Sequence, residues 1–273
     1  ASDNGLFMPE YIPKIPQAFF KNISGLSLPE ISFAVACTFL GDDVDSLVLK
    51  DIVYESLNFD IPLIKVTDRK YVLELYHGPT LAFKDVGARF MARLLAHFNA
   101  EDNDQRPVNV LVATSGDTGG AVANGFLNVP GVQVYVLYPK GKVSHIQESQ
   151  FTTLGQNITS IEVNGTFDDC QTMVKQAFMD VEINNHLKLT SANSINLARL
   201  LPQMFYYFYA YAQLKKAGRA ENVVICVPSG NFGNITAGLF GKKMGLSVRR
   251  FIAANNKNDI FYQYLQTGQY NPR

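Results

Sequence analysis

The spacing of apolar residues changes along the chain, and each change predicts a different kind of structure. Within residues 1–60 the apolar positions recur at helical spacing, as in VLKDIVYESLNF, which predicts a helical N-terminal region. Two short runs that follow, PLIKVT and KYVLELY, are typical of strands. The turn HGPTLAFKD then leads into an amphipathic helix, in which Val86, Phe90 and Met91 belong to one predicted apolar stripe.

Beyond Pro107 strands and helices alternate. The runs VNVLVAT, VQVYVLYP and ITSIEVN are separated by helical segments, an alternation that is typical of βαβ units with a parallel sheet. After an aromatic-rich helix, NVVICVP opens a second, shorter α/β block. We therefore predict a helical region over residues 1–60, a larger α/β domain over 61–106 and 187–273, and a smaller α/β domain over 107–186.

Composition and charge favour a small molecule as the partner. The 24 lysines and arginines equal the 24 aspartates and glutamates, so no net field would attract nucleic acid or an anionic membrane. The longest apolar and aromatic run, MFYYFYAYAQL, is too short to cross a bilayer. Three distant cysteines and four histidines without ligand spacing argue against disulfides and against a metal site. We expect a cytoplasmic protein, because the N-terminus also lacks the pattern of a secretory signal.

Lys84 stands at the predicted start of the amphipathic helix. The N-terminus of a helix carries partial positive charge, which disfavours an ammonium group there. The same field favours a neutral amine, which is the form that attacks a carbonyl or an aldehyde. The alternative is a surface lysine whose stem covers Leu81 and Phe83 while its head reaches water.

Two loops of one shape follow predicted strands. NVLVATSGDTGGAVANG begins at Asn109, and NVVICVPSGNFGNITAG begins at Asn222. In both, glycines at the end of a strand lead into a helix, an arrangement that lets backbone N–H groups bind a phosphate or a carboxylate. Neither loop contains G-x-G-x-x-G or the P-loop pattern. The alternative is that the glycines only form tight turns, but two such loops together with a lysine suit pyridoxal phosphate and an amino-acid substrate.

Five segments resemble the threonine synthase family, which consists of pyridoxal-phosphate enzymes of fold type II. They are HGPTLAFKD, ATSGDTGGA, YPKGKVSHIQESQ, SANSINLARLLPQ and PSGNFGN, and they occur in the family's order over nearly the whole chain. The resemblance implies an α/β fold of type II with two parallel-sheet domains and a helical N-terminal region. It also implies that the larger domain binds the cofactor and that the smaller domain lies on the substrate side.

The resemblance further implies the roles of particular residues. Lys84 would be the catalytic Schiff-base lysine and the acid and base at the substrate Cα and Cβ. The cofactor would contact Lys84, Asp117, Gly230, Asn231, Phe232, Gly233 and Asn234. The substrate would contact Ser115, Gly116, Thr118, Gly119, Asn193, Asn196 and Arg199. Many fold type II relatives carry Asn at the position of Asp117, so this Asp resembles a mark of the threonine synthase branch.

Arg199 is the best candidate for binding a substrate phosphate. A guanidinium group pairs bidentately with phosphate, and Lys140 and Lys142 are lesser candidates. The alternative for Arg199 is a salt bridge on the surface of a helix. For the two lysines the alternative is a solvated loop.

The implied reaction converts O-phospho-L-homoserine and water to L-threonine and phosphate, by γ-elimination and then β-addition of water. One alternative is another fold type II enzyme, such as a serine/threonine dehydratase or a cysteine-synthase-like enzyme, whose substrate carries no phosphate. Another is a catalytically silent threonine-synthase-like fragment, because the family's pattern continues beyond FYQYLQTGQYNPR and there supplies the partner of the pyridine nitrogen. We expect a monomer or a homodimer.

Overall fold

The computed structural model describes residues 6–193 and 196–271. Three parts of the quoted segments therefore lie outside the described residues. They are the first five residues of ASDNGLFMPE, the middle two of NSIN, and the last two of FYQYLQTGQYNPR, which include Arg273. No helix in the described ranges combines the length and the apolar character that a membrane crossing needs.

Three short helices occupy the N-terminal region, where the apolar spacing predicted helices. They are α1 (Gln17–Asn22), α2 (Leu28–Leu40) and α3 (Ser46–Ser56), with a 3₁₀ turn at Ile23–Gly25 after α1. Local sequence sets where they begin. Ser27 and Glu30 form a reciprocal capping box at α2, and Asp45 accepts hydrogen bonds from the first N–H groups of α3.

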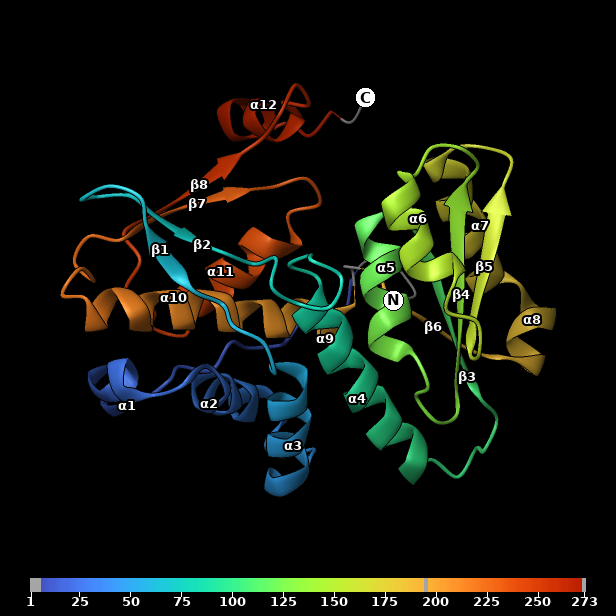
Figure 1. Cartoon of the computed structure of the whole chain (residues 1–273), viewed down its shortest axis with the longest axis horizontal. Helices are drawn as coiled ribbons and strands as arrows, with labels where there is room; N and C mark the ends of the chain where they lie inside the picture. The colour runs from blue at the N-terminus through green and yellow to red at the C-terminus, as the bar shows by residue number, and fades with distance from the viewer. Residues whose placement is uncertain (1–5, 194–195, 272–273) are drawn as a thin grey trace.

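Helix α4 (Asp85–Glu101) lies between the two halves of the molecule (Figure 1). It follows an antiparallel strand pair, β1 (Leu63–Lys65) and β2 (Tyr71–Leu73). Val86 and Phe90 belong to one hydrophobic core and Met91 to another. The predicted single stripe is therefore wrong, because α4 is apolar on two faces and packs against both cores.

The four-stranded sheet has the strand order β5-β4-β3-β6, and every neighbouring pair is parallel. Its strands are β3 (Val108–Ala113), β4 (Val132–Pro139), β5 (Ile158–Val163) and β6 (Lys188–Ser191). Val110 and Val134 pack with helix α5, whereas Leu111 and Tyr135 pack against the α7 side. Alternate residues of each strand thus pack on opposite faces of the sheet.

Helices cover both faces of this sheet. They are α5 (Asp117–Phe126), α6 (His145–Thr152), α7 (Phe167–Met179) and α8 (Val181–His186). Strand β6 pairs with β3 after residue 186, so the sheet extends past the boundary that the sequence suggested for the smaller domain. The domain division itself stays a proposal.

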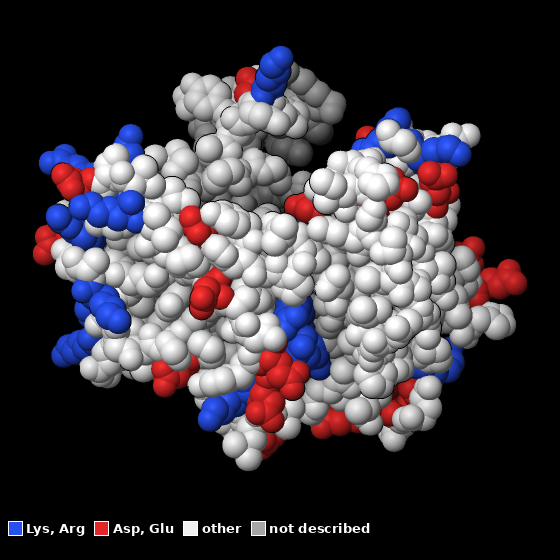
Figure 2. Space-filling model, viewed as in Figure 1, with Lys and Arg blue, Asp and Glu red and all other residues white. Residues whose placement is uncertain are grey.

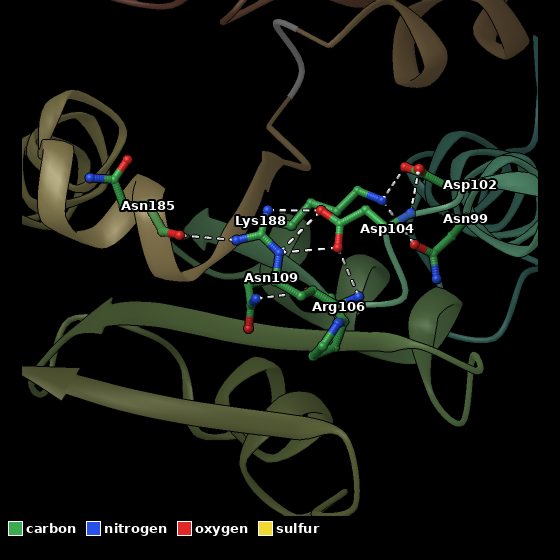
Figure 3. Close-up of polar contacts among 8 residues, drawn as sticks. Asn99, Asp102, Asp104, Arg106, Asn109, Asn185 and Lys188 are labelled. Carbon is green, nitrogen blue, oxygen red and sulfur yellow. Dashed lines mark hydrogen bonds and ion pairs between the residues drawn. The ribbon is translucent and has the colours of Figure 1, made fainter.

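A cluster of polar side chains ties the end of α4 to this sheet (Figure 3). The Arg106 guanidinium donates to Asp104 through Nε at 3.1 Å and Nη2 at 2.7 Å, and through Nη1 to the carbonyl of Asn185 at 3.1 Å. The hydrogen bond from Arg106 lowers the pKa of Asp104 to about 2. Lys188, on β6, forms an ion pair with Asp102. The polar segment AEDNDQRP between α4 and β3 is therefore held by contacts of Asp102 and of Arg106.

The other half of the molecule packs against the N-terminal helices. It contains α9 (Leu197–Leu200), a 3₁₀ turn (Leu201–Gln203), α10 (Met204–Lys216), β7 (Val224–Pro228), α11 (Gly233–Lys243), β8 (Arg250–Ala254) and α12 (Ile260–Thr267). Strands β7 and β8 form a parallel pair. Helix α12 lies at the periphery (Figure 1) and buries none of its residues.

Candidate functional site

Lys84 and Asp117 meet where the two halves of the molecule join. Lys84 is the N-cap residue of α4, and Asp117 is the first residue of α5. Lys84 Nζ lies 2.8 Å from Asp117 Oδ2, and the two side chains are 18% and 40% exposed. From the sequence we considered only the partial positive charge at the N-terminus of α4. The structure adds the Asp117 carboxylate, from a second helix, in contact with the same amine.

The turn before Lys84 is fixed by a buried carboxylate. Asp85 is 2% exposed; its Oδ2 accepts the Thr80 N–H at 3.0 Å, and its Oδ1 accepts the Thr80 hydroxyl. Burial raises the pKa of the Asp85 carboxyl, and the hydrogen bonds from Thr80 oppose this shift. Because both oxygens of Asp85 bind Thr80, the backbone that carries Lys84 has little freedom.

Two further side chains hold the same turn from other elements. The Tyr206 hydroxyl, on α10, donates to the carbonyl of Phe83, and burial raises the pKa of this tyrosine well above its usual range. Gln150 Nε2, on α6, donates to the carbonyl of Thr80 at 3.3 Å. Neither contact was expected from the sequence, because Tyr206 and Gln150 lie 123 and 70 positions from the residues that they contact.

In the first glycine-rich loop, packing explains two of the glycines. Gly116 has φ of 149°, and a Cβ there would lie 2.3 Å from Gln147 Oε1. The N–H groups of Gly116 and Gly119 donate to Thr114 Oγ1 at 3.0 and 2.8 Å. These two N–H groups already have partners, which supports the tight-turn alternative for both glycines.

The remaining candidates from this loop are Ser115, Asp117 and Thr118. Ser115 is exposed, and Thr118 is half-buried on the first turn of α5. Both lie beside Asp117 in the sequence and so at the same end of β3 as the Lys84 ion pair. This end of a parallel strand is where ligands of open α/β sheets bind.

The second glycine-rich loop has a different construction. A Cβ on Gly230 would meet no atom within 4 Å, and neither packing nor a left-handed conformation requires glycine there. Phe232 has φ of 59° at the N-cap of α11, which begins at Gly233. A bare backbone in front of an α-helix N-terminus fits the phosphate of pyridoxal phosphate.

Asn234 holds this loop in shape. Its Oδ1 accepts the Ile235 N–H at 2.9 Å and the Ser229 hydroxyl at 3.1 Å, and its Nδ2 donates to the Pro228 carbonyl at 2.8 Å. The side chain of Asn234 therefore supports the turn. Asn231, which precedes the turn residue, is exposed.

Arg199 is buried, although sequence reasoning also weighed a surface salt bridge. It is 1% exposed, its Nη1 donates to the Ala192 carbonyl, and its Nε has no partner among the described residues. Burial lowers the pKa of Arg199 to about 10, and the charge of Asp117 opposes this shift. The surface alternative is thus wrong, and Arg199 lies within the electrostatic reach of the Lys84 and Asp117 pair.

Three other candidates for binding the substrate already contact neighbouring residues of the protein. Asn196 caps α9, because its Oδ1 accepts the Ala198 N–H at 2.9 Å while its Nδ2 donates to the Ser191 carbonyl at 3.0 Å. Asn193 is half-buried and donates its N–H to Ser191 Oγ at 3.2 Å. Lys140 forms an exposed ion pair with Glu162 at 3.3 Å, in agreement with the solvated loop.

Charge elsewhere on the molecule is mixed. Figure 2 shows Lys and Arg interspersed with Asp and Glu on one face, both at its rim and within it. Within the described ranges no group of three or more His, Cys, Asp and Glu side chains is arranged to bind a metal ion. The candidate site consists of Lys84, Asp117, Arg199 and the loop at Gly230.

Comparison with known proteins identifies the class to which this fold and site belong. A family model described as pyridoxal-phosphate dependent enzyme matches residues 62–273, and another described as threonine synthase N terminus matches residues 1–57. The chain belongs to the family of pyridoxal-phosphate dependent enzymes. The cofactor and the fold class that the sequence predicted are confirmed.

Within this family the chain is similar to threonine synthases, so the resemblance seen in the sequence motifs is confirmed. It is 47% identical over 271 residues to the threonine synthase of Haemophilus influenzae, across 99% of this chain and 62% of that relative. The crystal structure of threonine synthase from Escherichia coli has a TM-score of 0.92 at 46% identity, across 100% of this chain and 63% of that one.

A second solved structure carries the cofactor. The structure of PLP-bound threonine synthase from Brucella melitensis has a TM-score of 0.90 at 38% identity, across 99% of this chain and 59% of that one. The chain spans about 62% of the length of the curated relatives that it matches first.

Proposed function

We propose that the protein acts as a threonine synthase, which converts O-phospho-L-homoserine and water to L-threonine and phosphate with pyridoxal phosphate on Lys84. The observation that carries this proposal is the position of Lys84 Nζ, 2.8 Å from Asp117 at the junction of the two halves. The identity of 47% to a threonine synthase supports the same reaction.

The residues present fit the cofactor. The loop Gly230 to Asn234 offers uncovered backbone at the start of α11, and a helix N-terminus favours a phosphate dianion. When bound, pyridoxal phosphate supplies an electron sink that weakens the bonds to hydrogen at the substrate Cα and Cβ. Lys84 is held by its turn so that Nζ can remove and return protons at these two carbons.

A phosphorylated substrate fits the buried arginine. An N–H group that is buried without a partner costs about 1–3 kcal/mol, so Arg199 Nε calls for an acceptor that the described chain does not provide. A phosphate dianion offers several acceptors and the opposite charge. Ser115, Thr118 and Asn193 are the further proposed substrate contacts, whereas Gly116, Gly119 and Asn196 would shape the site through their turns.

The arginine also separates this reaction from its first alternative. A dehydratase or cysteine-synthase-like enzyme acts on a substrate without a phosphate and has no need for a buried guanidinium. Solved structures of other pyridoxal-phosphate enzymes, such as a hydrogen sulfide-producing enzyme at 18% identity, show the fold alone. The silent-fragment alternative is tested by turnover of the substrates named below.

The remaining assignments complete the proposal. The larger domain, residues 61–106 and 187–273, would bind the cofactor, and residues 107–186 would form the smaller domain on the substrate side. The partner would be the small-molecule substrate, without nucleic acid, in a cytoplasmic monomer or homodimer.

The test begins with the lysine. The protein is loaded with pyridoxal phosphate, reduced with borohydride and digested, and the labelled peptide is mapped. We expect label on Lys84, its loss in Lys84→Arg, and its retention in Lys140→Arg, a matched control on an exposed loop. Label on another lysine in the unmodified protein would refute the assignment.

Substrate choice is tested on the same protein. We expect phosphate release from O-phosphohomoserine to exceed ammonia release from serine or threonine. Arg199→Lys keeps the charge but loses the fork, so it should raise KM for the phosphorylated substrate at least tenfold. Faster ammonia release, or a KM that Arg199→Lys leaves unchanged, would favour the dehydratase alternative. Label on Lys84 without turnover of any of these substrates would favour the silent fragment.

A further inference from the structure

The ion pair between Lys84 and Asp117 poses a chemical problem for the proposed function. An ammonium group cannot attack an aldehyde, because its nitrogen has no free electron pair. Lys84 Nζ must therefore lose a proton before it joins the cofactor. A base in contact with Nζ would speed this step, and Asp117 Oδ2 lies 2.8 Å away.

Other basic groups near this turn are already engaged. Both oxygens of Asp85 accept hydrogen bonds from Thr80. His77 Nε2 is bonded to Glu74 Oε2 at 2.8 Å. Asp117 has a different environment, because its side chain is 40% exposed and can exchange a proton with water.

We propose that Asp117 is the acid and base partner of Lys84 in the attachment of the cofactor, an inference that rests on the proposed function. The Asp117 carboxylate takes one proton from the Lys84 ammonium, and the freed electron pair on Nζ attacks the aldehyde carbon. One proton from nitrogen and the proton held by Asp117 pass to the former aldehyde oxygen, which leaves as water as the C=N bond forms. The linked nitrogen keeps one proton and carries one positive charge, as the ammonium did.

These reaction steps need no further reactant. One ammonium and one aldehyde give one protonated C=N linkage and one water, with a charge of +1 on both sides. After the linkage forms, the same carboxylate faces the positive nitrogen and stabilises it.

The test measures how fast the cofactor attaches rather than how fast the enzyme turns over. Protein freed of cofactor is mixed with pyridoxal phosphate, and the second-order rate constant is followed by the absorbance of the linkage. General acid and base catalysis contributes about 100-fold or more, so Asp117→Asn should slow attachment about 100-fold. Asp168→Asn removes the same charge from the exposed first turn of α7 and should leave the rate unchanged.

A chemical rescue separates proton transfer from a structural role. Asp117→Ala leaves room for a small carboxylate, so added formate should restore attachment in proportion to its concentration, while chloride at equal ionic strength should not. An unchanged rate in Asp117→Asn, or slow attachment in Asp117→Ala that formate fails to restore, would overturn the inference. The borohydride map keeps the two proposals apart, because label away from Lys84 in the unmodified protein refutes the proposed function itself.

Discussion

Thr80→Val tests whether the buried carboxylate beneath Lys84 holds the turn. Valine has nearly the shape of threonine but lacks the hydroxyl that donates to Asp85 Oδ1. Thr80 is 5% exposed and Asp85 is 2% exposed, so water cannot easily replace the lost donor. The N–H of Thr80 still donates to Oδ2, which leaves one oxygen of the carboxylate without this partner.

The magnitude follows from the charge and the burial. A hydrogen bond to a charged group contributes about 1.5–3 kcal/mol, and a shift of 1 kcal/mol moves Tm by about 2–4 °C in a domain near this size. We expect Thr80→Val to lower Tm by about 3–12 °C at neutral pH. Thr80→Ser is the matched control, because it keeps the hydroxyl and loses one methyl group, at a cost of about 0.8 kcal/mol.

The pH dependence distinguishes the hydrogen bond from simple repacking. Burial raises the pKa of Asp85, and the Thr80 hydroxyl opposes this, so Thr80→Val should raise the pKa further. A carboxyl with a raised pKa in the fold adds most stability when it is protonated, and this contribution is lost as the pH rises through the folded pKa. The deficit of Thr80→Val should therefore shrink as the pH falls through that pKa.

Thermal unfolding measured from pH 8 downward checks this expectation, with both variants compared at each pH. The deficit of Thr80→Ser should stay nearly constant. If Thr80→Val loses no more stability than Thr80→Ser, and its deficit does not vary with pH, the Thr80 hydroxyl does not support the buried charge.

Three further substitutions address the two loops and the lysine turn. Gly230→Ala should leave Tm within about 1 °C, because its Cβ meets no atom within 4 Å, but it should weaken pyridoxal-phosphate binding at least tenfold in a fluorescence titration. Gly25→Ala, which also enters open space, should change neither quantity, and equal binding by both variants would exclude the phosphate role of the loop. Gly116→Ala should lower Tm by several degrees, since φ of 149° is a backbone conformation that residues with a Cβ rarely adopt; an unchanged Tm would contradict this backbone argument. Tyr206→Phe removes the donor to the Phe83 carbonyl and should cost about 0.5–1.5 kcal/mol in urea unfolding while slowing cofactor attachment; normal attachment would show that this bond does not position the lysine.

Much of the local structure could be predicted because its causes lie within a few residues. The capping box of Ser27 and Glu30 explains the start of α2, and the alternation of apolar runs after Pro107 predicted a parallel sheet. Lys84 was expected at the start of a helix, and it is the N-cap of α4. The family resemblance rested on short motifs of the same local kind.

Other features escaped the sequence argument because equal patterns have different outcomes in three dimensions. The apolar residues of α4 fit one stripe in the sequence, but neighbouring cores on both sides divide them between two faces. The two glycine-rich loops look alike, yet Gly116 has φ of 149°, which favours glycine, whereas Gly230 has no positive φ and its Cβ would enter open space. Arg199 fits a surface helix as well as a buried one until packing decides.

The sequence by itself determined the elements, the type of sheet and the lysine at a helix start, since backbone preferences and caps act between neighbouring residues. Only the tertiary structure decided what surrounds that lysine. Asp117 is 33 positions from Lys84, and Tyr206 is 123 positions from Phe83. Contacts over such separations depend on how helices and sheets pack, and no local pattern records that packing.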